Sequence, residues 1–555
     1  MNPNNVNKYL YIEKTPTWLV RGLFVIGMFA WIGVILGYVP FVKLNPIFFL
    51  IVFPIVTFLI VYHLVSYFIN LFYAQFDLKK HQRLMRVHEF LTNEKFKEEE
   101  VYPLVDIFLP ICGEGTKVLE RTFLFVSQLE YPNKKIYVLD DKGIPEHEHL
   151  AELFGFTYLS RPEKGHMKKA GNIKYGYERS EGKFIVIFDA DFAPHRDFIK
   201  ELIPYMDDPS VAIVQSPQYF QVDEEVHKRS PLEYGAAYVQ EDFYRVIQVA
   251  RDRLGAPICC GSNAIYRRTA LDAIGGTVQI EHSEDMYTGF ELSTRGWKVK
   301  YVPIILAVGL CPDGLHSYFH QQHRWCSGSL TLMLDKNFWN SKLSFIQKLC
   351  FISGFMYYLS YIFTIILSFQ AFFILLLYKN HITLWSALPF VPCMLFTFIL
   401  VRFFRLSRQR FGGYVARNAY LYSYVHASIA AFLKRSVGWQ PTNIKQASVS
   451  AVYMQQLKFA AIFFLAYTAL FAICIGNGAI NILNINSYSL LFWIFYTEVA
   501  TIIILIKFYL VLDEAKKKQA TKKNEEPNFL WTWRLKTVGT YSLLVAIAFA
   551  IGMTH

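Results

Sequence analysis

The chain has 555 residues, of which 53% are hydrophobic and 17% aromatic, and its formal net charge is +12. A mean hydropathy of +0.25 is too high for an ordinary soluble protein of this size and predicts membrane-spanning segments. Nucleic-acid binding would also explain the charge, but no basic recognition helix or ribonucleoprotein motif is present, so we expect no nucleic-acid partner. Eight scattered cysteines without a CxxC pair argue against a zinc site or a disulfide framework.

Two apolar stretches near the N-terminus, residues 23–39 and 46–73, are each long enough to cross a bilayer. The second follows so closely that we interpret both as transmembrane helices rather than a signal peptide. A basic stretch comes next, with Lys79, Lys80, Arg83 and Arg86. Because basic loops stay on the cytoplasmic side, we expect a multi-pass plasma-membrane protein whose next domain is cytoplasmic.

Residues 79–335 are typical of an α/β domain inserted between transmembrane helices. Short apolar runs alternate with helical stretches, which predicts a parallel sheet with crossover helices. The clearest run is Phe184–Phe188, a continuous apolar segment of the kind that forms a strand buried on both faces. Similar runs lie at residues 105–109 and 135–139.

Acidic residues follow all three of these runs: Glu114, Asp140 with Asp141, and Asp189 with Asp191. The ligand crevice of an open α/β sheet lies beyond the carboxyl ends of its strands, so we expect these carboxylates to converge. Asp189 and Asp191 supply the hard oxygen ligands that Mg²⁺ or Mn²⁺ takes together with diphosphate oxygens. Any one of these acidic endings could also be a solvated turn.

Three further segments carry polar groups suited to the same crevice. Lys168 and Lys169 precede a predicted helix and suit a phosphate-bearing ligand, although a solvated basic loop explains them equally. Ser283 is expected to cap a helix whose first turn contains Glu284 and Asp285. Gln321, Arg324 and Trp325 come just before the chain re-enters the membrane. Arg binds diphosphate bidentately and Trp stacks on sugars, but an interfacial anchor is the alternative.

Taken in chain order, four blocks resemble the signature of the processive family 2 glycosyltransferases, which include the cellulose, chitin and hyaluronan synthases. The blocks are Asp140-Asp141, Asp189-Ala190-Asp191, Ser283-Glu284-Asp285 and Gln321-x-x-Arg324-Trp325. Residues 258–262 resemble the block that approaches the acceptor. Residues 439–445 are similar to the gating loop of cellulose synthases, which carries a Thr and a Lys. The resemblance implies a GT-A-type cytosolic domain and a UDP-sugar donor.

The resemblance also implies a role for each matching residue. The catalytic set is Asp285 as general base with Glu284, Arg324 and Trp325. The UDP-sugar set is Glu114, Asp140, Asp141, Lys169, Asp189, Gln321, Arg324, Thr442 and Lys445. The metal ligands are Asp189 and Asp191, and the acceptor set is Trp325, Cys260 and Gly261. Ser283 stands where the family has Thr and Lys142 where it has Gly, which leaves room for a mixed-linkage (1,3;1,4)-β-glucan synthase.

We expect three parts: an N-terminal segment with two transmembrane helices (1–78), the glycosyltransferase domain (79–335) and a membrane half (336–555). The last holds interfacial helices, a gating loop (438–446) and about five spans that form a translocation channel. Those spans are expected at residues 349–378, 384–404, 457–475, 490–512 and 535–553.

The predicted function is processive, inverting β-glucan synthesis from UDP-glucose, with the growing glucan chain secreted through the bilayer. This leaves room for accessory secretion subunits. A hyaluronan- or chitin-type synthase using UDP-N-acetyl sugars is the alternative enzyme, and a channel with a nucleotide-sensing domain is the alternative from another class.

Overall fold

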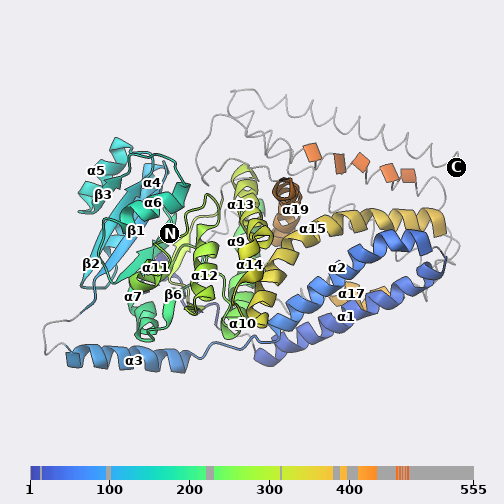
Figure 1. The fold of residues 1–555 in the computed structure, drawn as a ribbon, viewed down its shortest axis with the longest axis horizontal. Helices are drawn as coiled ribbons and strands as arrows, with labels where there is room; N and C mark the ends of the chain where they lie inside the picture. Colours follow the sequence, from blue (N-terminus) through green and yellow to red (C-terminus); the bar gives the residue numbers. More distant parts are fainter. Residues whose placement is uncertain are drawn as a thin grey trace.

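The computed structural model describes residues 2–12, 16–44, 46–95, 102–220, 231–312, 315–378, 388–396 and 411–433, with a few residues between 458 and 473. Figure 1 shows an α/β half on the left and long helices that project from it to the right. The expected gating loop and the spans expected at 490–512 and 535–553 lie outside the described residues.

A seven-stranded sheet in the order β3-β2-β1-β4-β8-β6-β9 forms the centre of the α/β half. Its strands are β1 (Val105–Ile111), β2 (Lys134–Asp140), β3 (Thr157–Ser160), β4 (Phe184–Ile187), β6 (Val211–Gln215), β8 (Ala264–Arg267) and β9 (Lys298–Tyr301). Strands β1 and β4 are buried along their whole length, and for β4 its continuous apolar run predicts this.

The expected α/β domain is confirmed, but a purely parallel sheet is wrong. Strands β1 to β4 pair in parallel, whereas β8 runs antiparallel to both β4 and β6. The chain reaches β8 through the turn at residues 261–263, beside the carboxyl end of β4. Strand β8 therefore begins at the edge where the parallel strands end, and it runs in the opposite direction to them.

Helices cover both faces of this sheet. They are α4 (Thr116–Ser127), α5 (Pro145–Leu153), α6 (Lys168–Tyr177), α7 (Phe198–Leu202), α11 (Arg268–Asp272) and α12 (Glu284–Thr294). Helices α4 and α7 contribute Phe123 and Phe198 to the core on one face. Helices α6 and α12 contribute Ile173 and Leu292 to the core on the other. Burial of these apolar side chains holds the strand ends, and so the site, in place.

A second sheet links the α/β half to the helical half. It has the order β5-β10-β7, with β5 (Phe192–Pro194), β7 (Tyr219–Phe220) and β10 (Ala307–Gly309). Phe192 and Phe220 pack in one buried cluster with side chains of α13 (Leu315–Leu334) and α19 (Phe411–Phe432). Since β5 begins directly after Asp191, this cluster ties the acidic end of β4 to the helical half.

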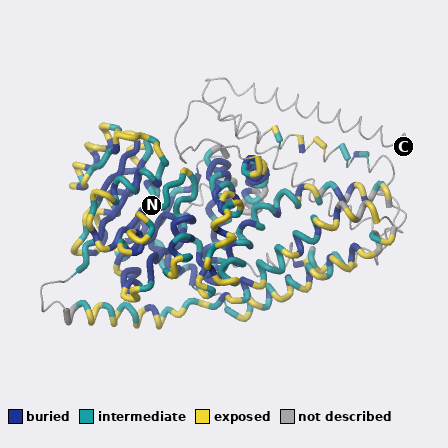
Figure 2. The backbone as a smooth tube through the Cα atoms, in the orientation of Figure 1, coloured by how far each residue is buried: buried dark blue, intermediate teal, exposed yellow. Residues whose placement is uncertain are grey.

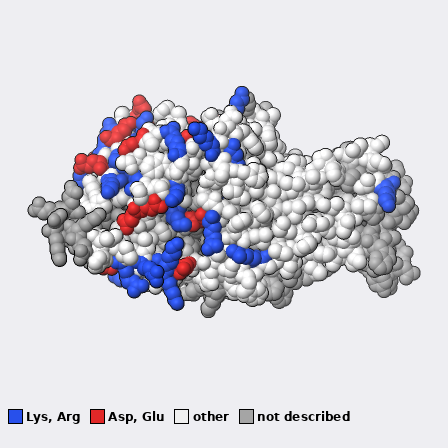
Figure 3. Space-filling model, turned by 60° about the horizontal axis from the view of Figure 1, so that its bottom comes forward, with Lys and Arg blue, Asp and Glu red and all other residues white. Residues whose placement is uncertain are grey.

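Three described helices are long and apolar enough to cross a membrane: α1 (Thr17–Leu44), α2 (Pro46–Asn70) and α15 (Phe345–Tyr378). The two N-terminal spans expected from the sequence are thus confirmed, and Pro54 lies inside α2. Many apolar side chains on these helices are exposed, among them Phe29 at 70%. Figure 2 shows exposed positions along the whole length of α1 and α2. In Figure 3 charged side chains crowd the α/β half, and the described surface of the helical half carries very few. The protein is a membrane protein.

The other described helices lie in several parts of the molecule. They are α3 (Leu78–Lys95), α9 (Pro231–Val239), the π-helix η3 (Phe243–Ile247), α10 (Gln248–Arg253), α14 (Lys336–Asn340) and α17 (Val391–Leu395), with short 3₁₀ turns η1 (Pro3–Asn5), η2 (Ile203–Asp207) and η5 (Leu388–Phe390). Helix α19 packs against α9 and α13.

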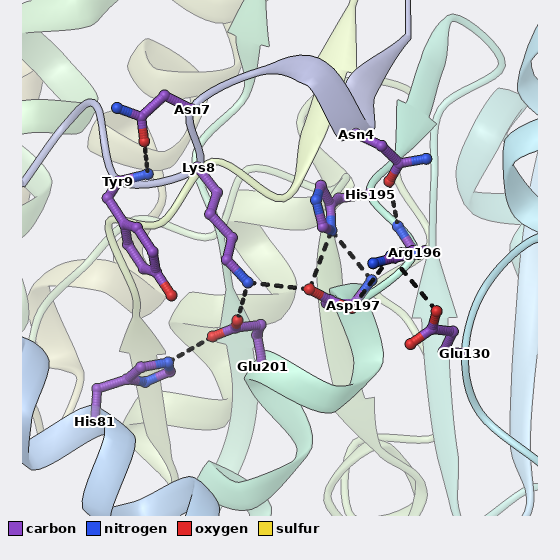
Figure 4. A network of polar contacts seen from close by, with 10 residues as sticks. All are labelled: Asn4, Asn7, Lys8, Tyr9, His81, Glu130, His195, Arg196, Asp197 and Glu201. Atoms are coloured by element: carbon purple, nitrogen blue, oxygen red, sulfur yellow. Dashed lines mark hydrogen bonds and ion pairs between the residues drawn. The ribbon is translucent and has the colours of Figure 1, made fainter.

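The segment before α1 is docked on the α/β half (Figure 4). The Lys8 ammonium lies 2.5 Å from Glu201 and 3.0 Å from Asp197, and His81 of α3 contacts the same Glu201 at 2.6 Å. The segment that precedes α1 and the helix that follows α2 therefore both contact α7. Both ends of the α1–α2 hairpin lie on the side where the α/β half lies.

Candidate active site

A cavity of about 770 Å³ lies at the carboxyl ends of β1, β2 and β4 and extends to α15 and α19. It brings together most of the residues singled out from the sequence, although they come from distant parts of the chain. Those that line it are Glu114, Asp141, Lys169, Asp189, Asp191, Cys260, Glu284, Asp285, Gln321, Arg324 and Trp325. The edge where the parallel strands end is thus the place where the candidate site forms.

Asp140 stands apart from this set. Its side chain is fully buried, and its carboxylate accepts hydrogen bonds from the backbone N–H groups of Lys142 (2.8 Å) and Ile144 (2.9 Å) and from the Tyr158 hydroxyl (2.9 Å). Burial alone would raise its pKa, but these bonds and a contact with His147 lower it to about 2. Asp140 shapes the turn after β2 and leaves Asp141 to face the cavity.

Asp141 is held in place by a cation that the sequence reasoning missed. Arg161 donates from Nε to the Asp141 carboxylate over 2.6 Å, and the backbone N–H of Gly165 donates to it over 3.0 Å. Both members of this ion pair are buried. Arg161 follows directly after β3. A search for charged residues beyond the carboxyl ends of the strands, which identified the acidic residues after β1, β2 and β4, would therefore have found it as well.

The two carboxylates after β4 have different surroundings. The backbone N–H of Asp189 donates to the Ser262 hydroxyl (3.0 Å), and its carboxylate pairs with the Lys169 ammonium. The Asp191 carboxylate pairs with no side chain in the described part of the chain. Burial, together with the charges of Asp189 and Glu114, raises the pKa of Asp191 to about 7. Glu114, Asp189 and Asp191 thus place three carboxylates on this wall of the cavity, and Lys169 pairs with Asp189.

Asp285 sits in the first turn of α12, where its carboxylate accepts a hydrogen bond from the Met286 N–H over 2.7 Å. Burial and the neighbouring Glu284 raise the pKa of Asp285 to about 7, while Lys169 opposes the rise. The expected helix cap by Ser283 is wrong. Ser283 adopts a left-handed conformation (φ 57°, ψ 39°), which turns its hydroxyl away from the first N–H groups of the helix.

Two cations face this acidic wall. The Lys169 ammonium donates to the Gly261 carbonyl over 2.9 Å and lies 3.8 Å from Glu284, in addition to its pairing with Asp189. Burial alone would lower the Lys169 pKa, but Asp189 and Glu284 raise it above its usual value, so the amine stays charged. Burial lowers the pKa of Arg324 on α13, while the same group of carboxylates opposes that effect.

The membrane-side wall of the cavity consists of tyrosines that the sequence reasoning did not single out. The hydroxyl of Tyr420 on α19 lies 3.0 Å from those of Tyr357 and Tyr361 on α15. Tyr424 stacks beside Tyr420 with ring centroids 4.6 Å apart. An ion pair between Arg417 and Asp242 (2.5 Å) lines the same region. The sequence could have indicated this wall. Tyr357 and Tyr361, and likewise Tyr420 and Tyr424, are four residues apart, which places both rings of a pair on one helix face.

Two predicted site residues, Thr442 and Lys445, lie outside the described residues. The pattern of acidic strand ends, a buried carboxylate with a raised pKa and two facing cations suits transfer chemistry on a substrate that carries a diphosphate.

Comparison with family models defines the class. Residues 106–275 match the model for glycosyl transferase family 2, and residues 273–414 match the cellulose synthase model. The two matches overlap at residues 273–275 and together run from β1 to the start of α19. Residues 106–275 thus carry a family 2 glycosyltransferase domain, and the α/β half has the GT-A-type fold expected from the sequence.

Within that class, the chain is cellulose synthase-like. It is 34% identical over 257 residues to cellulose synthase 1 of Komagataeibacter xylinus, covering 46% of this chain and 16% of that protein. A UDP-forming cellulose synthase 1 catalytic subunit of the same organism is 33% identical over 257 residues (46% of this chain, 34% of that protein). The UDP-forming cellulose synthase catalytic subunit of Xanthomonas axonopodis pv. citri is 29% identical over 265 residues (47% and 36%). The chain spans about a third or less of the length of these curated relatives.

Among solved structures, a mannosyltransferase from Pyrobaculum calidifontis in complex with GDP-Man and Mn²⁺ is similar at 17% identity and a TM-score of 0.45, covering 64% of this chain and 97% of that one. The first 349 residues of TarS from S. aureus match at 11% identity and a TM-score of 0.33, covering 60% and 93%.

Proposed function

We propose that the protein is a processive, inverting β-glucan synthase that uses UDP-glucose and secretes its product across the plasma membrane. The product is cellulose or a mixed-linkage (1,3;1,4)-β-glucan. The observation that carries this proposal is that one cavity joins the acidic strand ends to the tyrosine wall of α15 and α19. Two of the relatives above are named as UDP-forming, which supports a UDP-linked donor.

Asp189 and Asp191 fit a divalent cation, Mg²⁺ or Mn²⁺. Their carboxylates are hard oxygen donors, and Mg²⁺ is usually held by one or two carboxylates together with substrate phosphates. The described residues contain no group of three or more His, Cys, Asp or Glu placed to hold a metal alone, so the diphosphate would complete the shell. The raised pKa of Asp191 marks a place where added positive charge is favourable. A bound ion would neutralise charge on the diphosphate.

In this proposal the donor lies along the acidic strand ends. Glu114, Asp141 and Gln321 line the uridine and ribose side of the cavity, while Asp140 fixes the turn that presents Asp141. Lys169 and Arg324 bind the diphosphate oxygens and stabilise the charge that develops on UDP as it leaves. Burial strengthens that stabilisation, because both cations lie in a cavity where water competes weakly.

Asp285 acts as the general base, with Glu284 beside it. An acceptor hydroxyl loses its proton to the Asp285 carboxylate, its oxygen forms a bond to the anomeric carbon, and the bond from that carbon to the diphosphate breaks. A single displacement of this kind inverts the anomeric configuration. A carboxylate with a pKa of about 7 is well matched to accept a proton near neutral pH.

The acceptor and the growing chain occupy the membrane side of the cavity. Trp325 stacks under the acceptor sugar, with Cys260 and Gly261 beside it, and the tyrosines of α15 and α19 line the path beyond. Aromatic rings bind the apolar faces of sugars while their hydroxyls remain able to bond with sugar oxygens. Support comes from the cavity itself, which runs from Asp285 to Tyr420 without interruption.

The remaining parts are assigned from the sequence likeness to cellulose synthases. We divide the chain into an N-terminal segment (1–78), a glycosyltransferase domain (79–335) and a channel-forming membrane half (336–555). Within the last, residues 438–446 form a gate in which Thr442 and Lys445 contact the diphosphate. The glycosyltransferase domain faces the cytoplasm, where UDP-sugars are made, and accessory secretion subunits complete export.

A donor screen tests the proposal. Purified protein in lipid nanodiscs is given UDP-glucose, UDP-N-acetylglucosamine, or UDP-N-acetylglucosamine together with UDP-glucuronic acid, each radiolabelled, and the product is digested with linkage-specific glucanases. We expect polymer from UDP-glucose alone, degraded by a cellulase or a lichenase. Polymer made from N-acetyl sugars would favour a chitin- or hyaluronan-type synthase, and turnover with no polymer would reject processive synthesis.

A further inference from the structure

Strained backbone gathers around the cavity. The described chain has four non-glycine residues with positive φ, at Met167, Lys168, Asn263 and Ser283. Met167 and Lys168 lead into the helix that carries Lys169, and Asn263 follows the serine that holds Asp189. Ser283 directly precedes Glu284 and Asp285. Such conformations persist only where their surroundings enforce them, and they concentrate at functional sites.

The surroundings of Ser283 include a glycine on a different helix. A Cβ atom added at Gly328 of α13 would lie 1.9 Å from the Ser283 Oγ and 2.4 Å from its Cβ. These separations are far below van der Waals contact, so the Ser283 side chain occupies the space that any side chain at position 328 would need. Glycine inside a helix is unfavourable compared with alanine, and here the close approach supplies the reason.

Gly328 also lies on the catalytic face of α13. It follows Arg324 by four residues, so the two share one face of the helix and lie one turn apart. Helix α13, which carries Arg324, thus contacts Ser283, the residue directly before Glu284 and Asp285. A second glycine lies on the other side of the base, because a Cβ at Gly261 would come within 2.5 Å of the Asp285 Oδ2 atom.

We infer that Gly328 is a positioning residue for catalysis, which acts through its contact with Ser283. The contact sets how far the base Asp285 stands from Arg324, and therefore from the leaving group. This inference rests on the proposed function. Filling position 328 would push Ser283 away and tilt the first turn of α12. A displacement of about an ångström at a reacting group costs on the order of a hundredfold in rate.

The contact predicts rescue. Gly328→Ala should lower kcat about tenfold to a hundredfold with little change in the KM for UDP-glucose, because the donor ligands Asp141 and Asp189 lie at the ends of β2 and β4, outside α12 and α13. Ser283→Gly removes both clashing atoms and accepts a positive φ, so alone it should keep kcat within a few-fold of wild type. The double variant Ser283→Gly/Gly328→Ala should return to the kcat of Ser283→Gly.

The experiment measures kcat, the donor KM and Tm for these three variants in lipid nanodiscs. Gly22→Ala is the matched control, because it makes the same change within a helix and its Cβ would meet nothing within 4 Å. Wild-type kcat in Gly328→Ala would overturn the inference. So would a loss that Ser283→Gly fails to restore. If Gly328→Ala alone does not fold, the double variant decides, since it must match Ser283→Gly. Failure of wild-type protein to make glucan would instead overturn the proposed function.

Discussion

The two ends of the cavity are built by different means. At the sheet end, short polar residues at strand termini carry formal charges, and most of them are held by partners, as Asp141 is by Arg161 and Asp189 by Lys169. At the membrane end the wall is made mainly of tyrosine rings whose hydroxyls bond to one another, as those of Tyr357 and Tyr420 do, and its charged residues Arg417 and Asp242 neutralise each other in an ion pair. The first end is suited to a diphosphate and the second to a neutral sugar chain.

This contrast assigns different work to the two ends. Charged groups hold one ligand tightly in one orientation, because charge-assisted hydrogen bonds are strong and have a fixed geometry. Aromatic rings bind the apolar faces of successive sugars with similar strength, which suits a chain that must slide. In the proposed mechanism Asp285 lies between the two ends, where the new glycosidic bond would form. Variants at the sheet end should therefore stop transfer, and variants at the membrane end should change the product.

The largest effect is expected at Asp285, between the two ends of the cavity. Asp285→Asn should reduce polymer synthesis by about a hundredfold or more, because general base catalysis contributes 10²–10⁴ in rate. Asp272→Asn, which alters an aspartate on the outer helix α11, is the control and should be near wild type. UDP affinity, measured by calorimetry, should be unchanged in Asp285→Asn. A loss of affinity as large as the loss of rate would place Asp285 in the nucleotide site instead.

The next largest effect concerns the acidic end. Asp191→Asn, and chelation of divalent ions from wild type, should each remove nearly all transfer, because the diphosphate charge would go unbalanced. Mg²⁺ or Mn²⁺ should restore wild type but not the variant. UDP binding with and without Mn²⁺ supplies a readout apart from turnover. Full activity after exhaustive chelation would break the proposed division between a metal-dependent end and a neutral end.

A pH profile tests the proposed role of Asp285 as general base. The base must be deprotonated, and its pKa of about 7 lies above that of an ordinary aspartate. The value of kcat/KM, measured at saturating metal from pH 5.5 to 9, should therefore rise about tenfold per pH unit below 7 and level off above it. A profile that stays flat down to pH 5.5 would contradict a base with this pKa.

The smallest effect is expected at the membrane end. Tyr361→Phe keeps the ring and removes a hydroxyl, so about 0.5–1.5 kcal/mol of hydrogen bonding is lost. Product length should fall two- to tenfold, while the rate of UDP release changes little. Tyr175→Phe, on the outer side of α6, is the control. A fall in UDP release with product length unchanged would show that this wall serves the donor rather than the chain.

The sheet end could be predicted from the sequence far better than the membrane end. Phe184–Phe188 ends in Asp189 within one local segment, and strand periodicity alone places such residues at one edge. The tyrosine wall draws on α15 and α19, where even Tyr361 and Tyr420, whose hydroxyls pair, are 59 residues apart in the sequence, so only tertiary packing brings them together. The antiparallel β8 and the left-handed Ser283 were missed for a related reason, because each depends on where the chain enters from a neighbouring element.

The most direct test of the two-ended cavity is a cryo-EM structure of wild-type protein caught during turnover with UDP-glucose and Mn²⁺ in lipid nanodiscs. The account predicts UDP density against Asp141, Asp189 and Lys169, and sugar rings that run from Trp325 along Tyr361 and Tyr420 toward the membrane. Polymer density that leaves by the solvent side of the sheet, or UDP bound among the tyrosines, would contradict it.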